Sequence, residues 1–319
     1  MPTRSTRRRK PEHSSIIKGL KLGVGRLAMA TGAVALIAGG VMAYKITIHQ
    51  PEQYHDLLTD KVQVMLPKYD NFNCSTLEEI LSHQDASVTP QQRRAALRDN
   101  TSMVLEMREN YSLVPVGSAT MISTGGYFTT VAHNIDDALN NPKIKGILIF
   151  HLSTNSFYLA TSAILDIENA AAILYAPTGY PHSPVKGIEF RSDEVNQGEK
   201  LNLTAIGFTS AYPPKYRIAS SSGKLTDSSV LEKPFIIEGK EIYFGANPGA
   251  LIVEGIRPSG GTSGGSVSDD KGKIVGTEEG AYGGIDVKDY KGATVTPVSF
   301  LKPLAKQCSV QILGSYIKP

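Results

Sequence analysis

Two short segments, 130 residues apart, contain the residue types of nucleophilic catalysis. One is Thr129-Thr130-Val131-Ala132-His133, an apolar run that ends in a histidine; the other is Ser259-Gly260-Gly261-Thr262-Ser263-Gly264-Gly265-Ser266. Serine is a weak nucleophile, so it needs a base within hydrogen-bond reach and donors for the oxyanion that its attack creates. Glycines allow a tight turn whose backbone N–H groups can supply those donors. His133 and Ser263 are therefore candidates for general base and nucleophile.

The order of these two residues along the chain excludes one class of enzyme. Residues 261–265 satisfy the Gly-x-Ser-x-Gly pattern of α/β-hydrolases, in which the catalytic histidine follows the serine. All seven histidines here precede Ser263, so that assignment fails. His151 and His182 are interpreted as structural or surface residues, and the others lie before residue 100. His133 is the best-placed candidate for the base because it closes an apolar run, where a strand would end at a cleft; a structural histidine is the alternative at this position.

The segments that must position this pair are short, β-rich and separated by Gly, Asn, Asp or Pro. Two successive sets of such runs, joined by a connector over residues 177–197, predict an all-β fold with two antiparallel six-stranded β-barrels and a cleft between them. We place the first barrel at about residues 101–180 and the second at about 198–306, with a C-terminal helix over 299–307 and a tail over 307–319. The expected strands are 103–107, 118–123, 127–132, 146–151, 157–165, 171–176, 201–207, 216–220, 235–238, 241–244, 250–254, 265–267, 273–277 and 293–297.

Residues 45–100 predict a stalk and a short helical preface to the barrels. A capping residue, Ser75 or Thr76, precedes Leu77-Glu78-Glu79, and Pro90 can begin a second helix.

The basic character of the chain belongs to its first 26 residues. They contain eight basic side chains and one acid; removing them from the totals of 33 basic and 30 acidic residues leaves 25 and 29, a formal charge of −4. A basic surface for nucleic acid is therefore not expected on the folded body.

An uncharged stretch of 18 residues, 27–44, follows this basic tail. As a helix it would be about 27 Å long, close to the hydrocarbon thickness of a bilayer. The positive residues before it predict a single-pass membrane anchor with a cytoplasmic N-terminus and the rest of the chain outside. A cleaved signal peptide, with Val41-Met42-Ala43 at the cleavage site, is the alternative and would give a secreted protein. A buried core helix is a third interpretation.

Cys74 and Cys308 are the only cysteines. Outside the cytoplasm they can form one disulfide, and two free thiols are the alternative. No CxxC, HExxH or Cys/His cluster offers a metal site, and we expect no cofactor.

A family resemblance ties these observations together. Residues 117–122, the Gly125 turn, residues 129–133, residues 261–266 and the following 272–276 together resemble the trypsin/chymotrypsin-like serine proteases, in the style of their bacterial, disulfide-poor members. The resemblance covers roughly residues 101–306. It implies that His133 is the general base, that Ser263 is the nucleophile, and that the backbone N–H groups of Gly261 and Ser263 form the oxyanion hole.

The chain departs from this family at the acid of the triad. Similar proteins have Asp-x-x-x-Asp-Leu-Ala-x-Leu before a strand, and residues 166–174 follow that pattern with Ala170 in the catalytic position. The acid normally holds the imidazole in its useful tautomer, and replacing it with asparagine lowers turnover about 10⁴-fold in the family's template.

Three interpretations of Ala170 follow. Another side chain can reach His133, the site can work slowly as a Ser–His dyad, or the domain is a non-cutting relative that binds a peptide or a protein partner. The candidates for a substitute third member are Asp166, Glu168, Asn169 and Asp137.

The sequence thus predicts a serine endopeptidase acting on peptide or protein substrates outside the cytoplasm, with a catalytically impaired binding domain as the alternative. Three charged residues are candidates for substrate binding. Arg257 by analogy would lie near the primary pocket and favour an acidic side chain, whereas Glu278 and Glu279 would favour a basic one. Each of the three is also readily interpreted as a solvated surface charge.

Overall fold

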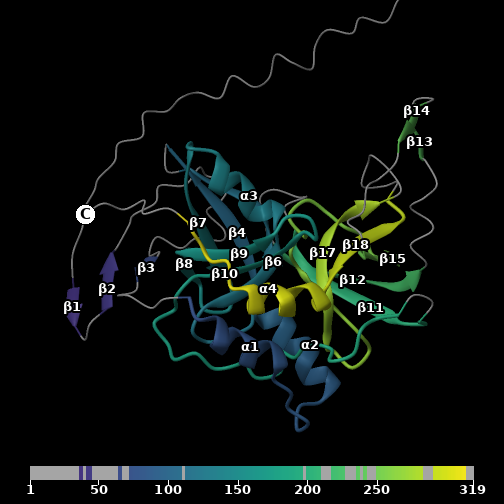
Figure 1. The fold of residues 1–319 in the computed structure, drawn as a ribbon, viewed down its shortest axis with the longest axis horizontal. Coiled ribbons are helices and arrows are strands. Elements are labelled where there is room, and N and C mark those ends of the chain that lie inside the picture. Colours follow the sequence, from purple (N-terminus) through teal and green to yellow (C-terminus); the bar gives the residue numbers. More distant parts are fainter. Residues whose placement is uncertain are drawn as a thin grey trace, which may run out of the picture. The chain divides into compact units, whose positions relative to one another are not determined.

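The computed structural model describes residues 72–109, 112–196, 199–209, 217–226, 249–282 and 290–313, and the backbone of five short strands within 36–66 and 235–242. Most of the strands among these residues belong to one open sheet and one closed barrel (Figure 1). The open sheet has the order β1-β2-β3-β8-β7-β4-β5-β6-β10-β9-β19. Its strands are β1 (Leu36–Ala38), β2 (Val41–Tyr44), β3 (Val64–Leu66), β4 (Thr101–Arg108), β5 (Leu113–Met121), β6 (Tyr127–Val131), β7 (Ile144–His151), β8 (Ser156–Ala160), β9 (Ser162–Asp166), β10 (Ala171–Tyr175) and β19 (Gln311–Ile312).

The second half of the chain forms a closed barrel in the order β11-β12-β15-β18-β17-β16. Every neighbouring pair in it is antiparallel. A separate two-stranded sheet, β13 (Phe235–Ile237) with β14 (Lys240–Ile242), lies between β12 and β15 in the sequence. The barrel strands are β11 (Asn202–Thr209), β12 (Arg217–Thr226), β15 (Leu251–Glu254), β16 (Ser266–Ser268), β17 (Ile274–Tyr282) and β18 (Gly292–Pro297).

The expectation of two closed six-stranded barrels is therefore wrong for the first half, which is an open sheet. Closure would require β8 to pair with β9, but each of these strands has another partner at its free edge. β3 pairs with β8 in parallel, and β19 pairs with β9. Covering both edges with other strands satisfies their backbone groups without closing the sheet.

One expected strand, residues 157–165, is two strands that meet at Thr161. β8 pairs with β7, whereas β9 pairs with β10. At the junction the Thr161 N–H donates to the Tyr175 carbonyl at 2.8 Å, and its own carbonyl accepts from Leu313 at 3.0 Å. The chain thus changes partner strands at this residue, which an apolar pattern running through it does not reveal.

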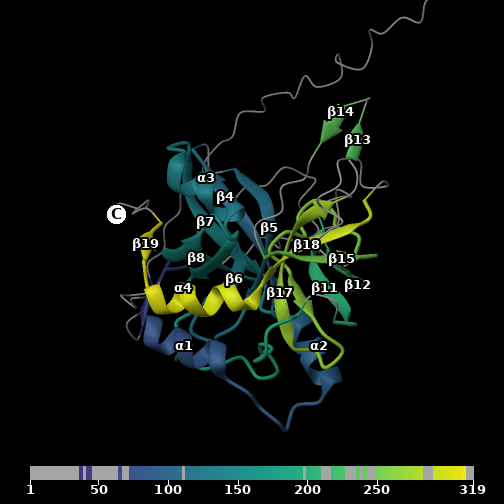
Figure 2. The ribbon, with the colours of Figure 1, turned by 45° about the vertical axis from the view of Figure 1, so that its right-hand side comes forward.

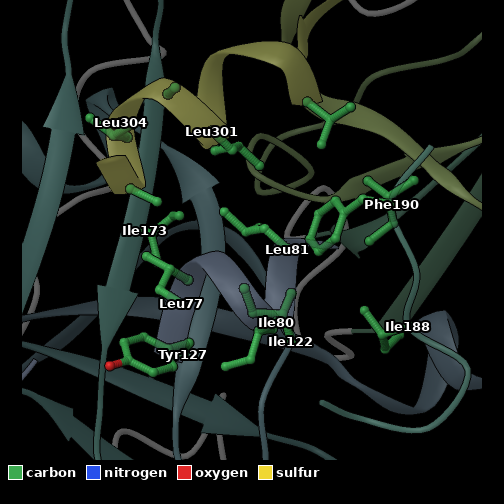
Figure 3. Close-up of a cluster of buried hydrophobic side chains, with 14 of the residues drawn as sticks. Leu77, Ile80, Leu81, Ile122, Tyr127, Ile173, Ile188, Phe190, Leu301 and Leu304 are labelled. Carbon is green, nitrogen blue, oxygen red and sulfur yellow. The ribbon is translucent and has the colours of Figure 1, made fainter. Parts of the chain in front are cut away.

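The helical preface packs into the same core as both halves of the chain. α1 (Cys74–Ser82) is capped by Asn73, whose side chain accepts from the Thr76 N–H, in place of the expected Ser75 or Thr76. α2 (Pro90–Asp99) begins at Pro90 as expected, with a capping box between Thr89 and Gln92. Buried apolar residues of α1, the open sheet, the barrel and the C-terminal helix form one cluster (Figure 3). Its members include Leu77, Ile80, Leu81, Leu97, Tyr127, Ile173, Ile188, Phe190, Ile206, Ile274, Leu301 and Leu304.

The C-terminal helix, α4 (Leu301–Gln307), follows a 3-10 turn over Val298–Phe300 and lies alongside α1 (Figures 1 and 2). Cys74 at the start of α1 and Cys308 at the end of α4 form a disulfide, with their Cα atoms 5.9 Å apart. This bond and the Leu77–Leu301–Leu304 packing hold the preface against the C-terminal end of the domain.

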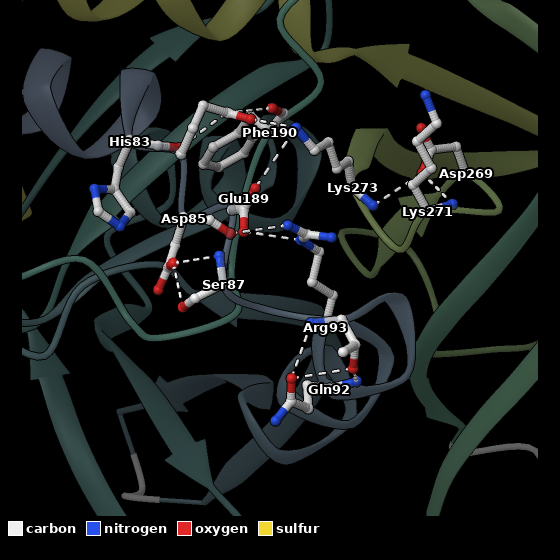
Figure 4. Close-up of polar contacts among 12 residues, drawn as sticks. His83, Asp85, Ser87, Gln92, Arg93, Glu189, Phe190, Asp269, Lys271 and Lys273 are labelled. Carbon is white, nitrogen blue, oxygen red and sulfur yellow. Dashed lines mark hydrogen bonds and ion pairs between the residues drawn. The ribbon is translucent and has the colours of Figure 1, made fainter.

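A buried ion pair makes a second attachment of the preface (Figure 4). Arg93 of α2 donates from Nε to Glu189 at 2.8 Å, and the Glu189 side chain is only 1% exposed. Lys273, which precedes β17 of the barrel, lies 3.6 Å from the same carboxylate. Glu189 thus joins α2, the connector between the two halves, and the barrel.

The N-terminal region differs from the expected helix where it is described. Within residues 27–44, β1 and β2 are strands paired with each other, and β2 pairs onward with β3. The other residues of that stretch, and the basic tail over 1–26, lie outside the described residues. Among the helices that the structure describes, none combines the length and the apolar character needed to cross a membrane.

Candidate active site

His133 is the first residue of a short helix, α3 (His133–Asn140), which begins just after β6 ends. α3 forms because Ile135 and Ala138 bury their side chains against the open sheet. The His133 side chain is exposed and makes no hydrogen bond to any described residue. Protein atoms around the ring still disfavour its charged form, so burial lowers the pKa of His133 below the ordinary 6.5. The imidazole is therefore mostly neutral at pH 7 and able to accept a proton.

Ser263 lies in a tight loop between β15 and β16 of the closed barrel. Two glycines in this loop have left-handed backbone conformations, with φ of 92° at Gly261 and 90° at Gly264. At Gly264 a side chain is also excluded sterically, because a Cβ atom would lie 2.1 Å from the Ser118 carbonyl oxygen. The turn is closed by hydrogen bonds from Thr262 N–H to Ser259 and from Gly265 N–H to Thr262. These constraints explain the glycines on both sides of the serine.

The open sheet holds this loop through Ser118 of β5. The Ser118 N–H donates to the Ser263 carbonyl at 2.7 Å, and its hydroxyl donates to the Gly261 carbonyl at 2.6 Å. The same hydroxyl accepts from the Phe208 N–H of β11 at 2.7 Å. One serine of the open sheet is thus bonded both to the nucleophile loop and to a barrel strand.

Asn134 connects the histidine to the serine. Its side-chain amide donates to the Ser263 carbonyl at 2.9 Å and to the Thr130 hydroxyl at 3.0 Å. Because Asn134 directly follows His133, this bond holds the start of α3 against the loop that contains Ser263, although the two segments are 130 residues apart in the sequence.

The Ser263 hydroxyl does not donate to His133 in this structure. It donates instead to the backbone carbonyl of Glu279 on β17, at 3.1 Å. Catalytic hydrogen bonds are often absent or long without substrate, and a rotation of the serine side chain would redirect the proton. In this structure the Ser263 hydroxyl is therefore bonded to β17 and not to the candidate base.

Two backbone N–H groups beside Ser263 have no hydrogen-bond acceptor among the described residues. They belong to Gly261 and to Ser263 itself, and both residues are half-buried. Unpaired N–H groups are rare in folded proteins, and they are the donors that an oxyanion hole requires.

Ala170 lies next to the histidine, between β9 and β10. Its carbonyl accepts from the Ala132 N–H at 3.0 Å, and Ala171 is paired with Val131. Its φ of 54° is in the left-handed region, which aspartate and asparagine adopt more readily than alanine. Ala170 is thus bonded to the residue before His133, and it has a methyl group where the pattern of similar proteins has a carboxylate.

None of the four substitute candidates contacts His133 in the described structure. Asp166 accepts from the Asn169 N–H at 3.0 Å and from its side-chain amide at 2.7 Å, so these two residues are paired with each other. Glu168 is exposed on the same turn, and Asp137 is exposed one helical turn beyond His133.

The three charged candidates for substrate binding lie in different environments. Arg257 is exposed, and its backbone N–H donates to the Ser221 hydroxyl at 3.2 Å. Glu278 is 2% exposed and contacts Thr262, so it lies beneath the nucleophile loop and not at a substrate-facing surface. Glu279 is half-buried beside Ser263, and burial raises the pKa of its carboxyl.

Sequence reasoning assigned no role to Ser118 or Asn134. Position 118 follows a glycine, and the structure explains that glycine, because a Cβ atom at Gly117 would lie 2.2 Å from the Asn134 amide nitrogen. The only signal in the sequence was thus a glycine inside a strand, which indicates a close approach without naming the partner. Within the described residues there is no group of three or more His, Cys, Asp or Glu that could hold a metal ion.

The closed barrel, the histidine after β6 and the serine between glycines before β16 match the expected arrangement. The chain resembles trypsin-like serine proteases. No family model matches the chain, and no curated protein sequence does.

Solved structures with a similar fold include the active form of the Rv3671c protease from M. tuberculosis, with a TM-score of 0.48 and 14% identity over 79% of this chain and 99% of that one. The serine endoprotease from Yersinia pestis has a TM-score of 0.48 and 15% identity over 70% of this chain and 67% of that one. Likeness at this level carries no functional conclusion, so the function of this chain depends on its own site residues.

Proposed function

We propose that this protein is a serine endopeptidase in which Ser263 attacks the peptide bond and His133 is the base. The observation that carries the proposal is the hydrogen bond between Asn134 and the Ser263 carbonyl, which joins the two candidate segments beside two unpaired N–H donors. Base, nucleophile and oxyanion donors are the three components that acyl transfer needs.

The chemistry follows from these groups. Ser263 Oγ attacks the scissile carbonyl carbon while its proton passes to a ring nitrogen of His133. The N–H groups of Gly261 and Ser263 stabilise the negative oxygen of the tetrahedral intermediate. His133 then gives the proton to the leaving amine as the C–N bond breaks, which leaves an ester on Ser263. A water molecule, deprotonated by His133, hydrolyses the ester and regenerates the serine.

Ala170 makes a slow Ser–His dyad the favoured form of this proposal. Without a carboxylate beside the ring, the imidazolium that forms during attack is not stabilised, and the ring is free to adopt either tautomer. The lowered pKa of His133 is consistent with a base that has no anionic partner. Asp166, Glu168 and Asn169 remain candidates for a third member only if the turn that contains them rearranges.

The second candidate function is a catalytically impaired domain of the same fold that binds a peptide or a protein partner. Two observations favour it, namely the alanine at position 170 and the Ser263 hydroxyl that points to Glu279. In either case the ligand is a polypeptide, and Glu279, whose backbone carbonyl accepts from the Ser263 hydroxyl, or the exposed Arg257 would select its side chains.

Covalent labelling of Ser263 by a fluorophosphonate probe separates the two functions. An enzyme should label at Ser263, and the label should be lost in Ser263→Ala and slowed by at least about tenfold in His133→Ala, because the base activates the nucleophile. Both variants change side chains that are exposed or half-buried, so we expect them to fold. Circular dichroism would verify this. Folded protein that gives the same blank as Ser263→Ala would contradict the enzyme function.

We also propose that the folded domain lies outside the cytoplasm, secreted or attached to a membrane through the segment 27–44; as an anchor, this segment would have to release the pairing of β1 and β2 and become helical. The support is the basic tail before an uncharged stretch, together with the Cys74–Cys308 disulfide, which is a bond typical of oxidising compartments. Protease added to intact cells should digest the domain and spare the N-terminus; digestion of the N-terminus would contradict this topology.

A further inference from the structure

Glu278 is a buried carboxyl group directly beneath the nucleophile loop. Its backbone pairs with that loop, since the Gly264 N–H donates to the Glu278 carbonyl at 2.6 Å and the Glu278 N–H donates to Gly265 at 2.8 Å. Its side chain, 2% exposed, contacts the hydroxyl of Thr262. Thr262 lies between Gly261 and Ser263, whose N–H groups are the candidate oxyanion donors. The carboxyl therefore contacts the residue that lies between the two donors.

The contacts of Thr262 determine which form of Glu278 fits. The Thr262 hydroxyl oxygen accepts from the Ser259 N–H at 3.1 Å and lies 2.8 Å from the Ser259 carbonyl oxygen, in addition to contacting Glu278. A hydroxyl has one proton, so it cannot donate to the Ser259 carbonyl and to an ionised Glu278 at the same time. If Glu278 has a proton, it donates to Thr262, and Thr262 donates to Ser259. The neutral carboxyl satisfies all three contacts.

The surroundings of Glu278 also favour the neutral form. Burial raises the pKa of Glu278 to about 7, and the hydrogen bond to Thr262 opposes the rise only in part. No charged group contributes to this shift. Its backbone partners are Val295 of β18 and Gly264 and Gly265 of the nucleophile loop, none of which titrates. The titratable residues of the site are Glu279, next on β17, and His133.

We propose that Glu278 is a positioning residue of the active site, which in its neutral form fixes Thr262 and with it the oxyanion donors of Gly261 and Ser263. The role in catalysis rests on the proposed peptidase function. Ionisation of Glu278 forces Thr262 to give up its bond to the Ser259 carbonyl, and it places a buried charge under the loop. The loop then loses the geometry that two converging donors require.

The proposal predicts a peptidase that works in a narrow pH window. On the acid side, activity rises as His133 loses its proton, with a midpoint below 6.5. On the alkaline side, kcat falls about tenfold for each pH unit above about 7, as Glu278 ionises. KM changes little, because the oxyanion donors act in the transition state and not on the bound substrate.

The test compares the wild-type chain with Glu278→Gln, which has a neutral amide that can donate to Thr262 at every pH. In Glu278→Gln we expect the alkaline fall in kcat to disappear while the acid limb stays. Thr262→Val, which keeps the shape but removes the hydroxyl, should lower kcat at all pH values. Glu79→Gln, on the exposed face of α1, is the matched control and should leave the profile as in the wild type. An alkaline limb that is unchanged in Glu278→Gln overturns the proposal.

Hydrogen exchange of the loop gives a readout that does not need catalysis. Backbone exchange over residues 259–266, corrected for its intrinsic pH dependence, should speed up in the wild type as the pH passes about 7, and stay constant in Glu278→Gln. If exchange behaves this way but no variant cleaves peptides at any pH, the peptidase function fails while the positioning by Glu278 stands. If exchange is the same in the two proteins, the positioning role is overturned whether or not the protein is an enzyme.

Discussion

Position 170 offers the most direct chemical change at the scale of single residues. Its backbone is bonded to Ala132 beside His133, so an aspartate there would place a carboxylate next to the imidazole. We expect Ala170→Asp to raise kcat/KM by about two to four orders of magnitude, because the carboxylate stabilises the imidazolium and fixes the tautomer. The left-handed φ of 54° is favourable for aspartate, so the change should not destabilise the fold.

Ala170→Asn is the matched control for this substitution, since it has the same shape and backbone preference without the charge. Peptide hydrolysis and thermal unfolding would be measured for both variants. Equal activities of Ala170→Asp and Ala170→Asn would show that position 170 is not aligned with the acid of the triad.

At the scale of elements, the hairpin of β9 and β10 positions Ala170, and its turn is held by the pair of Asp166 and Asn169. Asp166→Ala removes two half-buried hydrogen bonds, so we expect it to lower the free energy of unfolding by about 1–2 kcal/mol. We expect kcat/KM to change by less than about threefold, because the carboxylate does not contact His133.

Denaturant unfolding and peptide hydrolysis measure the two effects separately. Glu168→Ala, an exposed change on the same turn, is the control and should alter neither. A fall of several orders of magnitude in the activity of Asp166→Ala would instead identify Asp166 as a third member of the site that reaches His133 during catalysis.

The sequence predicted the positions of the strands along the chain well. It did not predict which strands pair with one another in the sheet. Alternation and turn residues located β4, β6, β10 and β18 to within a few residues, because those signals are local. Thr161 shows the limit: its apolar neighbours continue a strand, and only the pairing of β9 with β10 and β19 makes it a corner. Edge partners such as β3 and β19 decide whether a sheet closes, and they are distant in sequence.

The candidate site shows the same division. His133 and Ser263 can be chosen as candidates from the sequence because the chemistry proposed for them requires specific residue types in specific local settings. Asn134 and Glu278 were not, since each acts through a contact with a loop more than 15 residues away. The glutamate was even assigned to the substrate side, because sequence alone does not say which face of β17 is buried.

At the scale of the whole molecule, the preface is tied to the rest of the domain by the Cys74–Cys308 disulfide. The bond closes a loop between residues 234 positions apart, so it restricts the unfolded chain strongly. We expect the double variant Cys74→Ser with Cys308→Ser to lose about 2–5 kcal/mol of unfolding free energy. Denaturant unfolding of both proteins, with and without a reducing agent, is the measurement.

The reducing agent supplies the internal control for this prediction. It should destabilise the wild type to the level of the double variant and leave the double variant unchanged. A wild type that keeps its full stability after verified reduction would show that the packing of α1 on α4 suffices without the covalent bond.

The contact between α1 and α4 also determines how late in synthesis the fold of this domain can form. Ribosomes add about 5–20 residues per second, so roughly ten to fifty seconds separate the emergence of Cys74 from that of Cys308. Throughout that interval the apolar side chains of Leu77 and Leu81 lack their contacts with Leu301 and Leu304, and the thiol of Cys74 lacks its partner. The first helix of the domain is therefore among the last to gain its native contacts. Until Cys308 has been made, the nascent chain must avoid aggregation through α1 and premature oxidation of the Cys74 thiol.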